Sequence, residues 1–188
     1  MSHPDRLIVG ISGASGTLYG IRMLRALAPL PVESHLILSR AARVTLAHET
    51  DIRPEAVESL ADLVHAPEDM AAAPSSGSFR TLGMVVAPCS VRSMSEIASG
   101  VTSTLLARAA DVQLKERRRV VLMVRETPLH AGHLQTMTRL AEMGAVIAPP
   151  VPAFYGRPDG IEALVDHSVG RVLDLFGIKH DLVTRWGE

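Results

Sequence analysis

Residues 7–16 of this chain run LIVGISGASG, an apolar, largely β-branched stretch that ends in a turn of small residues. Helical periodicity begins at once, with an apolar residue every third position from 18 to 27. Gly13 and Gly16 allow close backbone approach, and Ser12 and Ser15 add hydroxyl donors. A buried strand feeding a tight turn and a helix leaves unpaired backbone N–H groups at the helix start, which suits a phosphate. Because many such units bind nothing, a phosphate site and a purely structural turn both stay open.

Apolar strand-like runs alternate with helical segments along the rest of the chain. The strand-like runs are continuous rather than alternating, which is typical of strands buried on both faces. The sequence therefore predicts an α/β fold, with residues 1–188 forming a single domain built on a Rossmann-like (flavodoxin-like) parallel sheet with helices on both faces. The expected strands are 7–12, 33–38, 83–87, 119–124 and 145–148, and the expected helices are 17–28, 40–49, 94–97, 105–114, 130–143 and 161–176.

Composition excludes several functional classes. A net charge of −1 argues against general affinity for nucleic acid or for an anionic membrane surface. No apolar run approaches the roughly 20 residues that a membrane span needs. The single cysteine, Cys89, has no internal disulfide partner, and the first strand follows the N-terminus without a signal peptide. A cytoplasmic location is the expectation.

Hydroxyl groups and cations follow the predicted strands. Ser39 follows the strand at 33–38, Ser90 to Ser93 follow the strand at 83–87, and Arg125 follows the strand at 119–124. Carboxyl ends of parallel strands meet at one edge of the sheet, where ligands bind in this architecture. Ser39 or Ser90 alone could be only the N-cap of the next helix, although capping and phosphate binding are compatible roles. Their coincidence at one edge predicts an anion site.

Further short motifs occur in order along the whole chain. They are GASG at 13–16, SSGS at 75–78, PCS at 88–90, RAAD at 108–111, KE at 115–116, RETPL at 125–129, HL at 133–134, MG at 143–144, FY at 154–155 and RW at 185–186. Together they resemble the UbiX/Pad family of flavin prenyltransferases. The stretch SSGSFRT at 75–81 is similar to the branch found beside hydroxyarylic acid decarboxylases. One departure is Gln135-Thr136, where many members have Glu-Asn.

The resemblance implies a metal-independent transferase. Such an enzyme joins a dimethylallyl group from dimethylallyl phosphate to N5 and C6 of reduced FMN. The prenylated FMN then passes to a UbiD-type decarboxylase as its cofactor. Family members assemble into dodecamers, with the flavin between subunits. Whether this chain prefers the monophosphate or the diphosphate ester stays open.

The resemblance also implies site residues. Those for FMN are Gly13, Ala14, Ser15, Ser39, Ser90, Val91, Arg92, Ser93 and Arg125, and those for the prenyl phosphate are Lys115, Tyr155 and Arg171. Glu49 and Glu126 are carboxylates on the binding side that could remove the proton from the flavin ring, and Ser15 could relay it. For each carboxylate the alternative is an ordinary helix-terminal charge.

The chemistry suits these residue types. Ionisation of an allylic phosphate places negative charge on the leaving group, which fixed cations and hydroxyls stabilise. Arg108, Asp111 and Lys115 share one helical face, which without the resemblance would indicate a surface ion-pair stripe. Trp186 could face the developing carbocation or could only anchor the tail.

The sequence also leaves open functions other than flavin prenyl transfer. The first is a non-catalytic FMN carrier or chaperone, which would not need a second phosphate site. The second is flavin-dependent cysteine decarboxylation, but the Pro-Ala-Ser-Ala-Asn-Thr segment of that group is here PCSVRS at 88–93, and its Met-Asn-x-x-Met-Trp motif is absent. A nicotinamide-dependent dehydrogenase fits worst, because Ser39-Arg40 replaces the ribose-binding acid. His130 and His133 have no third ligand at a metal-site spacing, and Cys89 is expected to pack rather than react.

Overall fold

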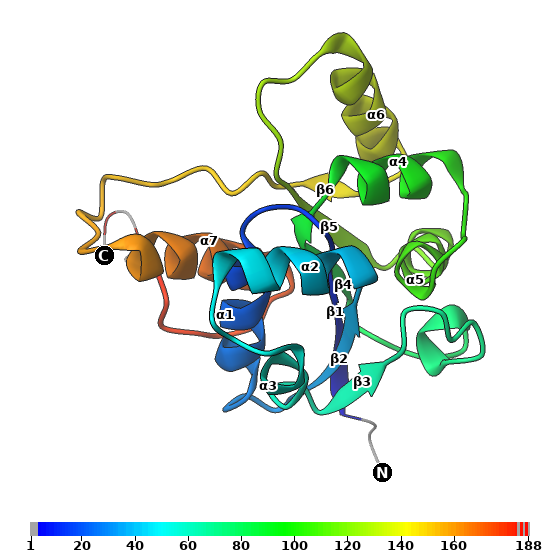
Figure 1. Cartoon of the computed structure of the whole chain (residues 1–188), viewed down its shortest axis with the longest axis horizontal. Helices are drawn as coiled ribbons and strands as arrows, with labels where there is room; N and C mark the ends of the chain where they lie inside the picture. The colour runs from blue at the N-terminus through cyan, green and yellow to red at the C-terminus, as the bar shows by residue number, and fades with distance from the viewer. Residues whose placement is uncertain (1–3, 184, 186, 188) are drawn as a thin grey trace.

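A parallel sheet of six strands, in the order β3-β2-β1-β4-β5-β6, forms the centre of the molecule (Figure 1). The computed structural model describes residues 4–183, 185 and 187. The strands are β1 Asp5–Ile11, β2 Val32–Leu38, β3 Leu63–His65, β4 Gly83–Cys89, β5 Arg119–Val124 and β6 Val146–Ile147. The helices are α1 Thr17–Leu27, α2 Arg40–Glu49, α3 Pro54–Glu58, α4 Val91–Ser99, α5 Leu105–Lys115, α6 Ala131–Glu142 and α7 Ile161–Leu175, with a 3₁₀ turn at Ala73–Ser75.

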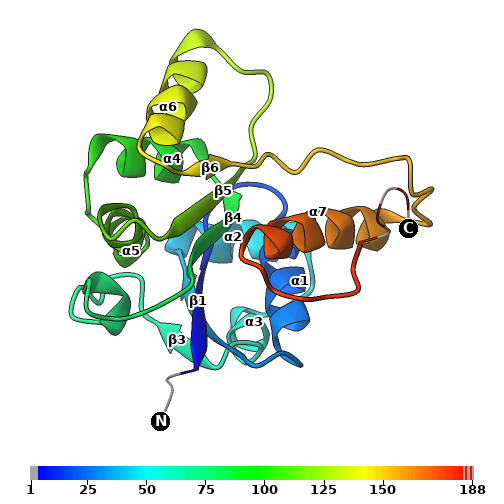
Figure 2. The same ribbon diagram turned by 180° about the vertical axis from the view of Figure 1, so that it is seen from behind.

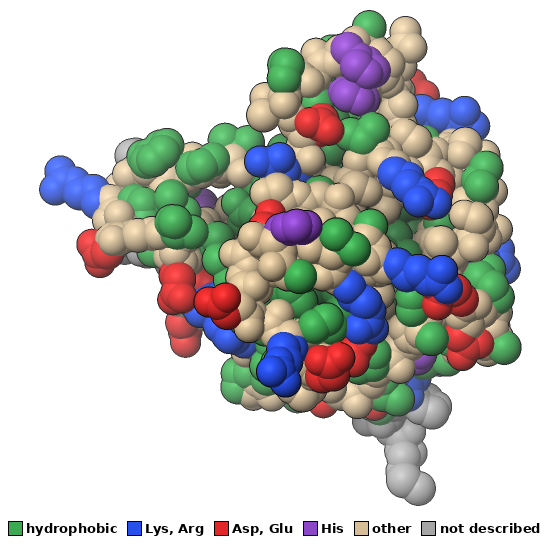
Figure 3. Space-filling view, in the orientation of Figure 1, with side chains coloured by type: hydrophobic (Ala, Val, Ile, Leu, Met, Phe, Trp, Pro, Cys, Tyr) green, Lys and Arg blue, Asp and Glu red, His purple; other side chains and the backbone are tan. Residues whose placement is uncertain are grey.

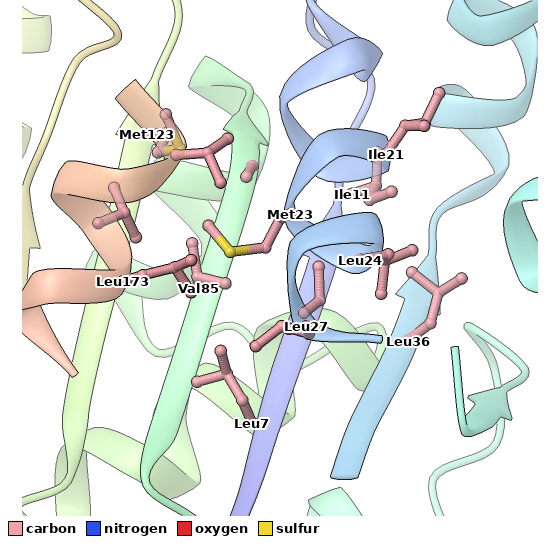
Figure 4. Close-up of a cluster of buried hydrophobic side chains, with 14 of the residues drawn as sticks. Leu7, Ile11, Ile21, Met23, Leu24, Leu27, Leu36, Val85, Met123 and Leu173 are labelled. Atoms are coloured by element: carbon pink, nitrogen blue, oxygen red, sulfur yellow. The ribbon is translucent and has the colours of Figure 1, made fainter. Parts of the chain in front are cut away.

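Both faces of the sheet are covered, so its central strands are apolar throughout. In β1, Leu7 and Ile11 pack under α1, α2 and α7, whereas Ile8 points to the opposite face, under α4 and α5. Figure 4 shows the first of these two cores, with Met23 of α1 and Leu173 of α7 over the strands. The predicted layered α/β fold is confirmed, and Figure 2 shows the helical layers from behind.

The predicted strands and helices are all present, with ends that differ by a few residues. Two further elements, β3 and α3, are present in the structure but were not predicted from the sequence. β3 has three residues, too few for a periodic pattern, and the side chains of Leu63 and Val64 are each 43% exposed at the sheet edge. α3 has a single turn and starts with Pro54, a residue favoured at the first helical position.

The strand order changes direction between β1 and β4. Connections from β1 run through β2 to β3 on one side, and from β4 through β5 to β6 on the other. In an open parallel sheet this point leaves a crevice at the carboxyl ends of the strands. The turn after β1 lies at this point of the sheet. Among the residues described, no helix has the length and apolar character needed to cross a bilayer.

Gly13 lets α2 approach the turn after β1. A Cβ at this position would lie 2.4 Å from the Cβ of Ala41 and 3.0 Å from its carbonyl carbon. Gly16, at φ 98°, adopts the left-handed conformation just before α1. Both glycines of the opening motif are therefore required by the backbone.

Gly13→Ala is expected to lower the free energy of unfolding by about 1–3 kcal/mol, because the added methyl group overlaps Ala41 backbone that cannot rotate away. Urea denaturation at a fixed protomer concentration measures the change. Gly160→Ala is the matched control, since a Cβ there meets nothing within 4 Å. Equal stability of the Gly13→Ala variant and the unmodified protein would contradict the close-approach explanation.

Candidate functional site

Ser12 joins the ends of β1 and β4 at the crevice. Its side chain is buried, and its hydroxyl donates to the carbonyl of Pro88 at 2.8 Å. The same oxygen accepts the backbone N–H of Ser90 at 2.7 Å. Ser12 is therefore a structural link that fixes the turn after β1 against the segment after β4.

Glu49, the last residue of α2, caps the start of α1. Its carboxylate accepts the backbone N–H of Gly16 at 2.9 and 3.0 Å, and the backbone N–H and hydroxyl of Thr17 at 3.0 Å each. Burial by itself would raise the pKa of Glu49, but hydrogen bonds from Ser15, Thr17 and Gly16 outweigh it and hold the pKa below its usual value. The carboxylate is therefore ionised at neutral pH.

This cap corrects the prediction that the amides at the start of α1 are unpaired. The N–H groups of Gly16 and Thr17 are taken by Glu49, and its negative charge would repel a phosphate at that point. The cap also brings Ser15 and Glu49 together, as a hydroxyl–carboxylate pair on the binding edge.

Hydroxyl donors lie farther along the same edge. The Ser39 oxygen accepts the backbone N–H of Ala42 at 3.1 Å, so it caps α2 while its own hydrogen stays available. The Ser90 oxygen accepts the backbone N–H of Ser93 at 3.2 Å and donates to the Ser93 hydroxyl at 3.2 Å. The hydrogen of Ser93 donates to no acceptor among the described residues.

Arg125 adds a cation directly after β5. Its backbone N–H donates to the carbonyl of Cys89 at 3.0 Å, which fixes it beside the end of β4. Its side chain is exposed and contacts no carboxylate of the described residues. Burial raises the pKa of Tyr19, and the guanidinium of Arg125 opposes that rise. Tyr19 therefore lies near this cation, although the sequence analysis did not single it out.

The other residues expected at the flavin differ in their surroundings. Ala14 is buried, and its N–H donates to the carbonyl of Ser12 at 2.9 Å. Val91 is half-buried in the first turn of α4. Arg92 is exposed and pairs with Glu96 at 2.9 Å along α4. Both Arg92 and Arg125 thus stand at the carboxyl edge, but only Arg125 lacks a carboxylate partner within the described part of the chain.

Tyr155 and Arg171 lie on one side of the molecule. The phenol of Tyr155 hydrogen-bonds to Nε2 of His167 at 2.7 Å, and Arg171 follows His167 by one turn of α7. His167 and Arg171 both line a cavity of about 230 Å³ under residues 148–151. Arg171 also pairs with Asp174 at 2.7 Å.

Lys115 lies elsewhere in the protomer. It ends α5, four residues before β5 begins, and therefore stands at the amino end of the sheet. It pairs with Glu116, next to Gly77. Figures 1 and 2 both show α5 and α7 on opposite sides of the sheet. Within one chain Lys115 therefore does not join Tyr155 and Arg171.

Several other expectations have clear structural outcomes. Arg108 pairs with Asp111 at 2.8 Å, as the ion-pair stripe predicted. Glu126 is exposed, and its carboxylate accepts the backbone N–H of Thr127 at 2.9 Å. Cys89 is buried, which raises the pKa of its thiol to about 12, so packing is its role. Trp186 lies outside the described residues.

His130, which caps α6, stacks on His133 in the first turn of that helix. Nδ1 of His130 accepts the backbone N–H groups of Gly132 at 3.1 Å and His133 at 3.4 Å. The two imidazole rings stack with centroids 3.6 Å apart. Within the described residues there is no group of three or more side chains placed to hold a metal ion.

The carboxyl edge opens between two projections. In Figure 3 the surface is hollowed between the lobe formed by α6, at the top, and the arm formed by the β6–α7 segment and α7, at the left. Apolar side chains on that arm are strongly exposed, with Val151 and Phe154 each at 72% and Ile161 at 73%. A single protomer thus leaves both the hollow and the arm open to solvent.

The chain is similar to known proteins over nearly its full length. The sequence model of the Flavoprotein family matches residues 1–173. Flavin prenyltransferase UbiX of Escherichia coli (strain K12) is 56% identical over 184 residues, which cover 96% of this chain and 97% of that protein.

Two solved structures share the fold over almost their full length. The crystal structure of AnUbiX (PadA1) in complex with FMN and dimethylallyl pyrophosphate superposes with a TM-score of 0.97 at 50% identity, covering 99% of each chain. That of a dodecameric FMN-dependent UbiX-like decarboxylase from Escherichia coli O157:H7 gives 0.95 at 47% identity, covering 97% of this chain and 100% of the other.

Glu49→Ala is expected to lower the free energy of unfolding at pH 7 by about 1 kcal/mol, the usual cost of losing a helix cap at an exposed position. The folded-state pKa of Glu49 is depressed, so its contribution is fully present above the unfolded-state pKa and is lost as the pH falls through the folded-state pKa. The difference from the unmodified protein should therefore shrink below about pH 4.5.

Urea denaturation across this pH range measures the effect. Glu142→Ala is the control, because this exposed carboxylate makes no hydrogen bond or ion pair with the described residues. A Glu49→Ala deficit that is the same at acid and neutral pH would show that the carboxylate charge does not stabilise α1.

Proposed function

The chain belongs to the UbiX family of flavin prenyltransferases, and we propose that its strand-end crevice joins a dimethylallyl group from dimethylallyl phosphate to N5 and C6 of reduced FMN. Sequence identity of 50% or more over nearly the full length supports this function. A shared fold alone would not support it, because one fold can carry many activities. The C–O bond of the ester breaks with its electrons on the phosphate as the prenyl C1 bonds to N5, which loses its proton. A proton then adds to the prenyl double bond, the tertiary carbon bonds to C6, and the C6 proton leaves as the ring regains aromaticity. One proton is released overall, and the departing phosphate can carry it. The product is prenylated FMN.

The residues at the carboxyl edge fit a flavin mononucleotide. The hydroxyls of Ser39 and Ser93 and the guanidinium of Arg125 supply donors and positive charge for a phosphate, away from the carboxylate of Glu49. Gly13 and Ala14 offer a surface without bulky side chains, on which a ring can lie. FMN supplies the nucleophilic nitrogen and carbon when it is bound and reduced. The protein's own contribution is to hold and orient it.

Ser15 and Glu49 are proposed to handle the proton. The carboxylate of Glu49 is ionised and hydrogen-bonded to the Ser15 hydroxyl, so Ser15 can pass a proton to it from the crevice. Glu126 is the second candidate, because its exposed carboxylate follows Arg125 at the end of β5. The departing phosphate is a third acceptor.

The prenyl phosphate is proposed to bind between subunits. Tyr155 and Arg171 supply a phenol and a cation on the arm, and Lys115 supplies a cation at the far edge of the sheet. A neighbouring copy would bring its Lys115 to the first copy's arm. The exposed apolar side chains of the arm support such assembly, and the dodecamer of the Escherichia coli O157:H7 relative supports its size.

A UbiD-type decarboxylase is the proposed recipient of the product, since prenylated FMN is a cofactor for that enzyme class. The proposed location is the cytoplasm, where reducing conditions suit a chain whose single cysteine is free and buried. A non-catalytic FMN carrier or chaperone is disfavoured, because it would not need Lys115, Tyr155 and Arg171 as a second set of phosphate-binding residues.

The function is tested by anaerobic incubation of the protein with reduced FMN and dimethylallyl phosphate. Mass spectrometry of the released flavin should show the gain of one five-carbon unit, and dimethylallyl diphosphate in a parallel reaction measures the ester preference. Heat-denatured protein is the control. Recovery of unmodified flavin from protein that binds FMN would favour a carrier.

Lys115→Ala and Arg171→Ala should each abolish most prenyl transfer while FMN still binds, because each removes a cation that stabilises the leaving phosphate. Co-expression of the two variants tests where these residues meet. If they come from different subunits, random mixed oligomers regain about a quarter of the sites, since a site then draws one intact residue from each variant. Single-variant oligomers are the controls.

No recovery of activity in mixed oligomers, with assembly confirmed by light scattering, would mean that Lys115 and Arg171 of one chain act together. Loss of FMN binding in either variant would remove that residue from the prenyl phosphate site.

A further inference from the structure

The segment between β6 and α7 carries Tyr155 and exposes several apolar side chains. Its apolar side chains point outward, with Val151 and Phe154 each 72% exposed. The phenol of Tyr155 meets the imidazole of His167 on α7, with its oxygen 2.7 Å from Nε2. The two rings lie edge-to-face, with centroids 5.5 Å apart and an interplanar angle of 82°. His167 therefore ties the phenol to the helix.

His167 also stands beside Arg171. The two residues are four apart on α7, so they share one helical face, and both line the cavity of about 230 Å³ under residues 148–151. His167 lines a second cavity of about 250 Å³ as well, with Asp166 and Asp181. Asp166 is held by Arg22, whose Nε donates to it at 2.7 Å. His167 thus contacts the phenol of Tyr155 and lines the same cavity as Arg171.

We propose that His167 is a positioning residue that holds the Tyr155 phenol beside Arg171 and directs its O–H toward an anionic phosphate. The inference rests on the proposed binding of the prenyl phosphate by Tyr155 and Arg171. His167 is argued to act through Tyr155 and to make no contact with the substrate itself.

The direction of the hydrogen bonds follows from the donors available. A phenol has one hydrogen, and an ionised phosphate oxygen can only accept. When the phenol donates to phosphate, its oxygen must accept from His167, so Nε2 of the imidazole carries a proton. Two hydrogen bonds in series, from imidazole to phenol to phosphate, polarise each other in the same sense. Loss of the imidazole removes the hydrogen bond that directs the phenol O–H toward the ester.

The experiment compares three substitutions in steady-state prenyl transfer with saturating reduced FMN. His167→Leu removes the donor, and KM for dimethylallyl phosphate should rise about tenfold, the effect of losing one oriented hydrogen bond. His167→Gln supplies an amide N–H and should restore KM to within about twofold of the unmodified protein. The FMN dissociation constant should be unchanged in both variants. A fall in kcat at unchanged KM would show that His167 does not position the phenol for the ester, and it would overturn the inference.

A double-mutant cycle tests whether His167 acts through Tyr155. Tyr155→Phe should raise KM by itself, and adding His167→Leu to it should have no further effect. An additional rise in KM in the double variant would overturn the inference, and so would an unchanged KM in His167→Leu alone. If the unmodified protein transfers no prenyl group, the proposed function itself is wrong. That result differs from active protein in which His167→Leu leaves KM unchanged, which would overturn only the role of His167.

Discussion

The hydrogen bonds between Glu49 and the start of α1 determine which part of the carboxyl edge can accept an anion. They place a fixed negative charge where a glycine-rich turn would otherwise offer amides to an anion. Helix α2 begins after Ser39 and ends at Glu49, and the two residues are ten positions apart, about 15 Å along a helix. An anion is therefore favoured at the Ser39 end and disfavoured at the Glu49 end. In the proposed site, this one short helix would orient a ligand that has a phosphate at one end and a proton to lose at the other.

Most of the fold could be predicted from the sequence because β1, β2, β4 and β5 are buried on both faces. Burial requires continuous apolar runs, and such runs are visible without a structure. β3 escaped prediction because three residues at a sheet edge bury little and show no period. α3, a single turn, escaped for the same reason.

The site could be predicted only where topology alone assembles it. Ser39, Ser90 and Arg125 each follow the carboxyl end of a parallel strand, so their placement at one end of the sheet follows from the strand assignment. The contact of Glu49 with Gly16 joins residues 33 apart through the packing of α2, which no local pattern reports. The contact of His167 with Tyr155 depends on how the arm folds back, although the four-residue spacing of His167 and Arg171 was a signal available in the sequence.

The position of Lys115 has a physical consequence for catalysis. A protomer that holds Tyr155 and Arg171 on one arm and Lys115 at the far edge of the sheet cannot surround a single phosphate. We infer that the complete set of cations exists only in the assembled protein. Assembly would also cover the apolar arm and exclude water from the crevice. A carbocation that forms there needs the leaving phosphate to be held by cations and needs water to be excluded. Linking the last cation to assembly therefore restricts ionisation of the ester to sites that are already closed.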